Sequence, residues 1–359
     1  MHYYPILKAK QGEIQALKEL KTTTKASTFP ILQIPPPNMS RPERGEEAVI
    51  IPHDSKSITT CIRRIKSLSG IHCFLDPTPA RLSKALIHNA VRAMAALPNP
   101  PAPVIELQGS DSYLAAYRAD IGEPETYCLR LPNEASIDAN IVSTIQRALR
   151  HYGLSVENGF LLLDVADVST TAANIIVYGH DAIKMFQRTA RLPFIEQVLA
   201  SGAFPITFPQ TAPSWVPLPY PRRDMELWRM VNAQIGVSYG DYAVSNPNNE
   251  PMPSYSGSPK ARYTARTDFV VVKGVKVDAR PFTMSEQYHR ISKIVKATTV
   301  YSGPGFSWGD GRIDGCCDPT STSNGNLTTW VAINTNHHIE FVTAQLRPAR
   351  SLSASSSGS

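Results

Sequence analysis

The stretch Tyr127–Val165, YCLRLPNEASIDANIVSTIQRALRHYGLSVENGFLLLDV, decides the fold. It opens with the apolar run YCLRL and continues through residues 136–152, where apolar residues recur at helical spacing. It closes with a second apolar run, GFLLLDV, at residues 159–165. Short apolar runs are typical of strands that are buried on both faces. The stretch therefore predicts a β-α-β unit, in which a helix crosses over the sheet and joins two parallel strands.

The same alternation of strand and helix runs through the first 245 residues. Strands are predicted at residues 4–10, 29–34, 71–76, 103–108, 127–131, 159–165 and 204–209, with an eighth around 242–244. Eight such units match a (β/α)8 TIM-like barrel, which typically takes about 250 residues. An open doubly wound parallel sheet is the alternative. That fold more often carries a glycine-rich phosphate loop after its first strand, and the turn Lys10–Glu13 holds one glycine.

The pattern changes after residue 245. We expect residues 1–245 to form the barrel and residues 246–346 to be an irregular C-terminal extension that completes or caps it. The extension contains a predicted strand at 267–274 and predicted helices at 284–296 and 326–346. The helix at 284–296 is a candidate for a displaced eighth barrel helix. Residues 347–359 form a serine-rich tail, for which we expect disorder. The 30 prolines fall largely at strand ends and in loops, as the rims of a barrel require.

Composition and charge exclude several classes of protein. The chain holds 36 basic and 30 acidic residues, a net charge of +6, with no block of five basic residues. An extended nucleic-acid groove is therefore not indicated, although a weakly cationic surface suits a small anionic ligand. No apolar run is long enough for a transmembrane helix, and the first residues lack the features of a secretory signal. The five cysteines, without any C-x-x-C, indicate a reducing, cytoplasmic setting.

Polar residues inside the predicted strands mark a candidate site. The outer face of each barrel strand must be apolar because helices cover it, so polar residues in these strands should point inward. They also lie near the carboxyl ends of their strands, where barrel active sites form. The inward set is Lys8, Lys10, Gln33, Glu106, Gln108, Arg130, Asp164 and Thr207. Just beyond strand ends lie Glu13, Asp76, Asp167 and Gln210. The alternative is that the charges are internal salt bridges without a catalytic role, since a buried charge requires a partner.

These residue types favour chemistry on an anion. Lys8, Lys10 and Arg130 suit a phosphorylated or nucleotide-like ligand. Glu106 or Asp164 would serve as general base or hold a divalent metal such as Mg²⁺ or Mn²⁺. Other candidates lie in the extension, where His337 or His338 would act as general acid. Asp310, in Gly309–Arg312 (GDGR), belongs either to a tight turn or to a loop over the mouth that touches the ligand. Sequence motifs of serine hydrolases, P-loop proteins and zinc proteases are absent.

With these residues in view, the chain resembles the "beta protein" family of phages and bacteria. The resemblance is carried by YPILKAKQGE at residues 4–13, FPIL at 29–32, GDYA at 240–243, RYT at 262–264, FSWGD at 306–310, and the closing segments from 325 to 339. It covers nearly the whole chain except the serine tail. The family has no settled activity. The resemblance implies a phage or mobile-element setting, and it supports Lys8, Lys10, Glu13, Asp310, His337 and His338 as site residues.

Two functional hypotheses are consistent with the sequence. In the first, a cytoplasmic barrel binds a phosphorylated or nucleotide-like anion at its C-terminal mouth, with Glu13, Gln210 and Asp310 among its ligand contacts, and hydrolyses it in the manner of a phosphodiesterase. In the second, the barrel is a non-catalytic module that binds such a ligand, or a phage or host protein, in conflict between phage and host. The sequence leaves the oligomeric state and the metal requirement open.

Overall fold

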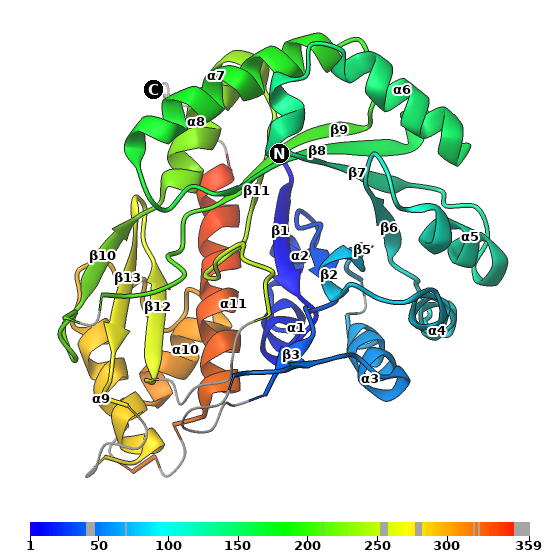
Figure 1. Ribbon diagram of the computed structural model, residues 1–359. Helices are drawn as coiled ribbons and strands as arrows, with labels where there is room; N and C mark the ends of the chain where they lie inside the picture. Colours follow the sequence, from blue (N-terminus) through cyan, green and yellow to red (C-terminus); the bar gives the residue numbers. More distant parts are fainter. Residues whose placement is uncertain are drawn as a thin grey trace, which may run out of the picture.

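The computed structural model describes residues 1–40, 47–68, 70–209, 211–251, 258–276, 282–318, 320–321 and 324–347. Eight parallel strands form a closed barrel (Figure 1). In barrel order they are β1 (Tyr3–Lys8), β2 (Ile31–Gln33), β5 (Phe74–Asp76), β6 (Ala102–Ile105), β7 (Tyr127–Pro132), β8 (Gly159–Asp167), β9 (Glu196–Gly202) and β11 (Ser238–Asp241), which pairs with β1. The prediction of a (β/α)8 barrel is confirmed.

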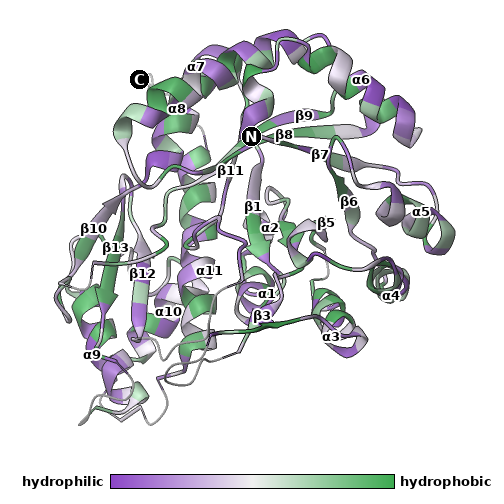
Figure 2. Ribbon diagram, viewed as in Figure 1, coloured by the Kyte–Doolittle hydropathy of each residue, from purple (hydrophilic) through white to green (hydrophobic). Residues whose placement is uncertain are grey.

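Helices surround the barrel, and all of those named here except α11 connect its strands. They are α1 (Gln11–Lys18), α3 (Ser55–Ile65), α4 (Lys84–Ala95), α5 (Asp111–Asp120), α6 (Ile141–Tyr152), α7 (Ala172–Thr189), α8 (Arg223–Ile235) and α11 (Leu327–Leu346). Local sequence explains where several begin; Asp54 caps α3 in a reciprocal capping box with Ser57. Hydrophilic and hydrophobic residues alternate along these helices, as expected of helices with one buried face (Figure 2).

An accessory module, defined here as β10, β12, β13, α9 and α10, stands beside the barrel. Its strands β10 (Leu218–Pro221), β13 (Asp268–Lys273) and β12 (Lys260–Thr264) form an antiparallel sheet in that order. The helices α9 (Met284–Lys296) and α10 (Trp308–Gly315) pack with this sheet and with α11 around one apolar core, in which Tyr288 stacks on Trp330 at 4.5 Å. Because α11 also packs against α1 and β1, it joins the module to the barrel (Figure 1).

The barrel strands sort their side chains into two cores. Alternate residues such as Ile6, Phe74, Cys128 and Leu162 fill the barrel interior. Their neighbours along each strand fill the layer between strands and helices. This alternation places Lys8, Gln33, Asp76, Glu106, Arg130 and Asp164 on the inward face at the carboxyl ends of their strands. The inward orientation predicted from the sequence therefore holds for Lys8, Gln33, Glu106, Arg130 and Asp164, and Asp76 shares it. It does not hold for Lys10 and Gln108, which are exposed beyond the ends of β1 and β6.

The seventh strand lies elsewhere than the sequence pattern predicts. It is β9 at Glu196–Gly202, whereas the pattern predicts the strand at residues 204–209. The run FPITFP looks strand-like because Phe204 and Phe208 are apolar, but they pack on the accessory sheet, 5.3 Å from the rings of Phe269 and Tyr220 respectively. Thr207, predicted to point into the barrel, is exposed outside any strand.

The eighth barrel helix also differs from the expected one. Residues 284–296 are helical as predicted, but α9 belongs to the accessory module. The helix that covers β1 and β11 is α11, which crosses α1 so closely that a Cβ on Gly12 would lie 2.8 Å from Val331. The residues after 245 thus contribute α11, which lies against the barrel, while β10, from within residues 1–245, joins the accessory sheet. The tail from residue 348 lies outside the described residues.

Two observations bear on the sequence-based expectations about membrane segments and cysteines. In the described part of the structure, no helix combines the length and apolar character needed to cross a membrane. The five cysteines, including the neighbours Cys316 and Cys317, are free thiols.

Candidate site at the mouth of the barrel

The side chain of Arg130 closes the carboxyl end of the barrel interior. Its guanidinium donates to Asp76 Oδ2 at 2.6 Å from Nη1, and to Asp164 Oδ2 at 2.5 Å from Nη2 and 3.0 Å from Nε. The hydroxyl of Tyr242 donates to Asp164 Oδ2 at 2.6 Å and accepts from Arg130 Nη2 at 3.0 Å. One largely buried cation is thus shared by two buried carboxylates. We call these four residues the Arg130 clamp.

Both carboxylates of the clamp are also fixed by the backbone. Asp76 Oδ1 accepts the N–H of Thr78 at 3.0 Å, and Asp164 Oδ1 accepts the N–H of Ala166 at 2.9 Å. Ala166 has a φ of 60°, in the left-handed region, and the register of β8 shifts between Asp164 and Asp167. Backbone strain of this kind persists where surrounding contacts impose it, and it clusters at binding sites. The turns therefore hold the two carboxylates in fixed positions before any ligand arrives.

A cavity of about 560 Å³ opens at the carboxyl ends of β5 to β8, within the size range of small-molecule sites. Its charged lining residues are Arg81, Glu106, Arg130, Glu134, Asp164 and Asp167. Glu106 follows β6 and is half-buried, and no described residue forms a hydrogen bond with its carboxyl group. Burial, followed by the charge of Asp76, raises the pKa of Glu106, although Arg130 opposes the shift. Glu106 is thus the cavity carboxyl best suited to exchange a proton.

The raised pKa of Glu106 predicts a stability difference. Folding makes the ionised form of Glu106 less favourable, so stability falls as pH rises from its ordinary pKa of 4.5 through the raised value. We expect Glu106→Gln to be more stable than the unchanged protein at neutral pH, and equally stable in acid below that ordinary value. Urea unfolding at both pH values measures this. Glu134→Gln, an exposed carboxyl of the same cavity, is the control and should show no such pH-dependent gain.

A second charged group lies at the end of β1. Lys8 is half-buried, and its Nζ donates to the carbonyl of Asn248 at 3.3 Å. Among the described residues, no carboxylate forms an ion pair with Lys8. Burial and the neighbouring Lys10 lower the pKa of Lys8, whereas Glu13 opposes the shift. Glu13 is buried in the first turn of α1 near Lys8, Lys10 and Arg262, and burial raises its pKa. Cations therefore outnumber carboxylates on this side of the mouth.

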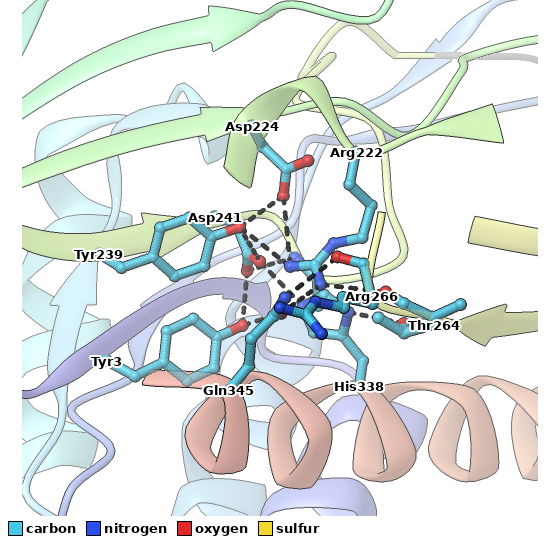
Figure 3. Close-up of polar contacts among 11 residues, drawn as sticks. Tyr3, Arg222, Asp224, Tyr239, Asp241, Thr264, Arg266, His338 and Gln345 are labelled. Carbon is cyan, nitrogen blue, oxygen red and sulfur yellow. Dashed lines mark hydrogen bonds and ion pairs between the residues drawn. The ribbon is translucent and has the colours of Figure 1, made fainter. Parts of the chain in front are cut away.

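The two histidines do not lie at the mouth as expected. They project from the middle of α11 into different buried clusters outside the barrel, and both are 0% exposed. His337 Nδ1 lies 2.8 Å from Asp310 Oδ2, and its Nε2 lies 2.9 Å from the carbonyl oxygen of Thr264. His338 Nε2 lies 2.9 Å from Asp241 Oδ2, behind the barrel wall (Figure 3).

Asp310 and Gln210 also differ from their predicted setting. Asp310 is buried in α10, where Tyr263 and Ser307 donate to its carboxylate, so it is neither in a tight turn nor in a loop over the mouth. Gln210 lies outside the described residues. The structure thus brings together Glu106, Arg130 and Asp164 at one cavity. It places Lys8, Lys10 and Glu13 at the end of β1, and it separates His337, His338 and Asp310 from both.

Sequence reasoning misses the part played by Tyr242 and underrates Asp76. The sequence pattern puts Asp76 only beyond a strand end, yet it is a full partner of Arg130. The same pattern makes Tyr242 part of an apolar strand. The signal that could have revealed its role is the alternation of Ser238, Gly240 and Tyr242, which share the inward face as β11 ends.

The described residues do not support the metal site considered from the sequence. They contain no group of three or more His, Cys, Asp or Glu side chains that could hold a metal ion. At the mouth, the guanidinium of Arg130 already occupies the position between Asp76 and Asp164 that a cation would take. We therefore assign no metal ligands at the mouth of the barrel.

The fold and the mouth together define a class: a (β/α)8 barrel with its polar groups gathered at the carboxyl ends of the strands, where barrel proteins bind ligands. Comparison with family models gives the narrower identity. Residues 3–344 match the family described as "Beta protein", so the chain belongs to that family, as the sequence resemblance implied. No curated protein matches the chain.

Several solved structures are similar to the chain at a low level. The chain is similar to a biosynthetic arginine decarboxylase from Campylobacter jejuni, with 8% identity, a TM-score of 0.40, and coverage of 96% of this chain and 55% of that one. A GH18 chitinase from Pseudoalteromonas aurantia has 10% identity, a TM-score of 0.35, and coverage of 67% and 93%. A glucosidase from Croceicoccus marinus has 10% identity, a TM-score of 0.32, and coverage of 51% and 48%, so the chain spans about half its length. Similarity this low carries no argument about activity.

Proposed function

We propose that the protein binds a phosphorylated, nucleotide-like molecule at the mouth of the barrel and hydrolyses it, with Glu106 as the acid–base group. The observation that carries this proposal is the state of Glu106. Its carboxyl group is half-buried in the cavity, has a raised pKa, and accepts no hydrogen bond from the described residues. Such a group can give a proton to a leaving oxygen or take one from water.

The distribution of charge supports a ligand with two chemically different ends. The cavity lining is acidic, because Glu106, Glu134, Asp164 and Asp167 outnumber its arginines, Arg81 and Arg130. Hydroxyl and amino groups of a ligand can donate to these carboxylates. Lys8 and Lys10, at the end of β1, offer cations for a phosphate. In this proposal the sugar or base lies in the cavity, and the phosphate lies toward the β1 side of the mouth.

The Arg130 clamp supports a second candidate, a barrel that binds its ligand without chemistry. The four residues of the clamp form hydrogen bonds and ion pairs with one another, as expected of a cluster whose role is only structural. A protein of this kind would capture a nucleotide-like signal, or a phage or host protein, and leave it intact.

Turnover assays separate the two candidates. The protein is incubated with a panel of nucleotides, oligonucleotides and phosphodiesters, with and without Mg²⁺ or Mn²⁺. Loss of a general acid–base group typically costs about 10²–10⁴-fold in rate, so we expect Glu106→Gln to lose turnover by that factor. Lys8→Met should weaken ligand binding roughly 10-fold or more, since a charge-assisted hydrogen bond contributes about 1.5–3 kcal/mol.

The matched control is Lys184→Met, which removes an exposed lysine of α7 and should change neither rate nor affinity. Turnover that survives in Glu106→Gln would disprove the role of Glu106. A bound nucleotide recovered intact, with no turnover across the panel, would favour the binding module.

A further inference from the structure

The end of β11 places two consecutive side chains on opposite sides of the barrel wall. Tyr242 points inward and joins the Arg130 clamp, with its hydroxyl 2.6 Å from Asp164 Oδ2. Asp241 points outward into a buried polar cluster between the barrel, α8 and α11 (Figure 3). A shift of the backbone at this point would therefore move the clamp and the outer cluster together.

The carboxylate of Asp241 fixes the turn that carries Tyr242. Its Oδ1 accepts the N–H of Ala243 at 2.9 Å, and Ala243 has a φ of 49°, in the left-handed region. Asp76 holds the turn after β5 in the same way, and Asp164 holds the irregular end of β8. The left-handed turn costs energy for a residue with a side chain, so the bond from Asp241 is what keeps it in place.

Three further donors orient Asp241 from outside the barrel. The hydroxyl of Tyr3 donates to Oδ1 at 2.5 Å, and the hydroxyl of Tyr239 donates to Oδ2 at 2.9 Å. His338 of α11 lies 2.9 Å from Oδ2 through its Nε2. Although burial opposes ionisation, His338 and Tyr3 lower the pKa of Asp241 to about 2, so the carboxylate is charged. Its position therefore depends directly on where α11 holds His338.

His338 is in turn held by the accessory module. Its Nδ1 lies 2.8 Å from the hydroxyl of Thr264, at the end of β12. A continuous chain of hydrogen bonds thus runs from β12 through His338 and Asp241 to the backbone at Ala243, and so to Tyr242 at the mouth. Arg222, at the start of α8, reinforces the cluster by donating to Tyr239 at 3.3 Å.

We propose that Asp241 and His338 are positioning residues, through which the accessory module sets the place of Tyr242 in the Arg130 clamp. His338, predicted from the sequence as a general acid at the mouth, acts in this proposal through Asp241 from behind the barrel wall. Its effect on turnover rests on the proposed function of the mouth. The effect of His338 on the position of Tyr242 does not depend on that function, and the two effects are measured separately.

The neighbouring His337 supplies a matched control. Both histidines are fully buried on α11, and each bonds to one buried aspartate: His338 to Asp241, and His337 to Asp310. Replacing either by phenylalanine keeps a ring and removes a comparable bond. His337→Phe also removes the bond to the carbonyl of Thr264, but it leaves the bonds from the Thr264 hydroxyl to His338 and from His338 to Asp241 in place, whereas His338→Phe removes both. His338→Gln is the rescue variant, because its amide nitrogen can stand in for Nε2 as donor to Asp241.

The test is the fluorine NMR signal of 3-fluorotyrosine introduced at position 242 of the full chain. We expect His338→Phe to shift this signal, His338→Gln to restore it largely, and His337→Phe to leave it unchanged. Thr264→Val, which removes only the hydroxyl that holds His338, should shift it less and in the same direction. Thr264→Val decides the question if His338→Phe does not fold. An unmoved signal in these variants, or an equal shift in His337→Phe, would overturn the proposal.

A turnover measurement extends the test to the proposed function. With a substrate of the mouth, His338→Phe should lower the rate about 10-fold, a loss of ~1.4 kcal/mol, and His337→Phe should not. If no substrate exists, the proposed function fails while the fluorine signal still decides the positioning role. A moved signal with an unchanged rate would show that Tyr242 is positioned but does not matter to the reaction, and it would overturn the proposal's functional half.

Discussion

Arg130→Met should lower the free energy of unfolding by about 3–5 kcal/mol, the cost of leaving buried charges without their partner. Asp76 is 0% exposed and Asp164 is 4% exposed, and both depend on the one guanidinium. Methionine fills similar space but donates no hydrogen bond, so two carboxylates would remain side by side in the barrel interior. Removing the cation costs far more than the clamp itself contributes, because desolvation of the carboxylates is no longer offset.

Urea unfolding at neutral pH measures this loss against two comparison variants. Lys296→Met breaks an ion pair between Lys296 and Asp314, whose side chains are 48% and 36% exposed, and it should change stability very little. The combined variant Arg130→Met/Asp76→Asn/Asp164→Asn removes the unpaired charges as well and should recover part of the stability. If Arg130→Met costs no more than Lys296→Met, the clamp does not hold the mouth in the way described.

Much of the mouth could be predicted from strand alternation alone. Lys8, Glu106, Arg130 and Asp164 interrupt apolar runs, and in a barrel wrapped by helices only the interior can accept them. No long-range contact has to be known for this prediction, because the alternation of residues within each strand shows which face is buried. Periodicity was also sufficient for most helices and for the count of eight strands.

Predictions failed where packing between distant segments decides the structure. The run at 204–209 has the apolar pattern of a strand, but its phenylalanines meet the accessory sheet, which no local pattern reveals. The histidine pair is expected at the mouth because imidazoles are common acid–base groups. The positions of the two histidines are set instead by the packing of α11 against α1 and α10. The contact with α1 joins residues that lie far apart in the sequence. Likewise, the local sequence does not show that the side chains of Asp241 and Tyr242 point to opposite sides of the barrel wall.

Gly309→Ala should be the most damaging single-methyl change in the accessory module. At this position α10 crosses α11, and a Cβ would lie 2.4 Å from the carbonyl oxygen of Ile333 and 3.2 Å from the backbone nitrogen of His337. Both atoms belong to the backbone of a buried helix, so neither can move aside alone. The N–H of Gly309 also donates to Asn336 Oδ1 at 2.9 Å, which ties the two helices at the same point.

Overpacking of a well-packed interface costs about 1–3 kcal/mol, occasionally more, and we expect Gly309→Ala to reach the upper part of that range. The control lies on the same helix: a Cβ on Gly315 meets nothing within 4 Å, so Gly315→Ala should be neutral or stabilise by up to about 1 kcal/mol. Because His337 is the residue next to His338 on α11, Gly309→Ala should also shift the fluorine signal of Tyr242, whereas Gly315→Ala should not. Equal unfolding free energies for the two variants would show that α10 and α11 do not cross this closely. The close crossing explains why the sequence GDGR lies in a helix: glycine, a poor helix former, is the residue that lets the two backbones meet.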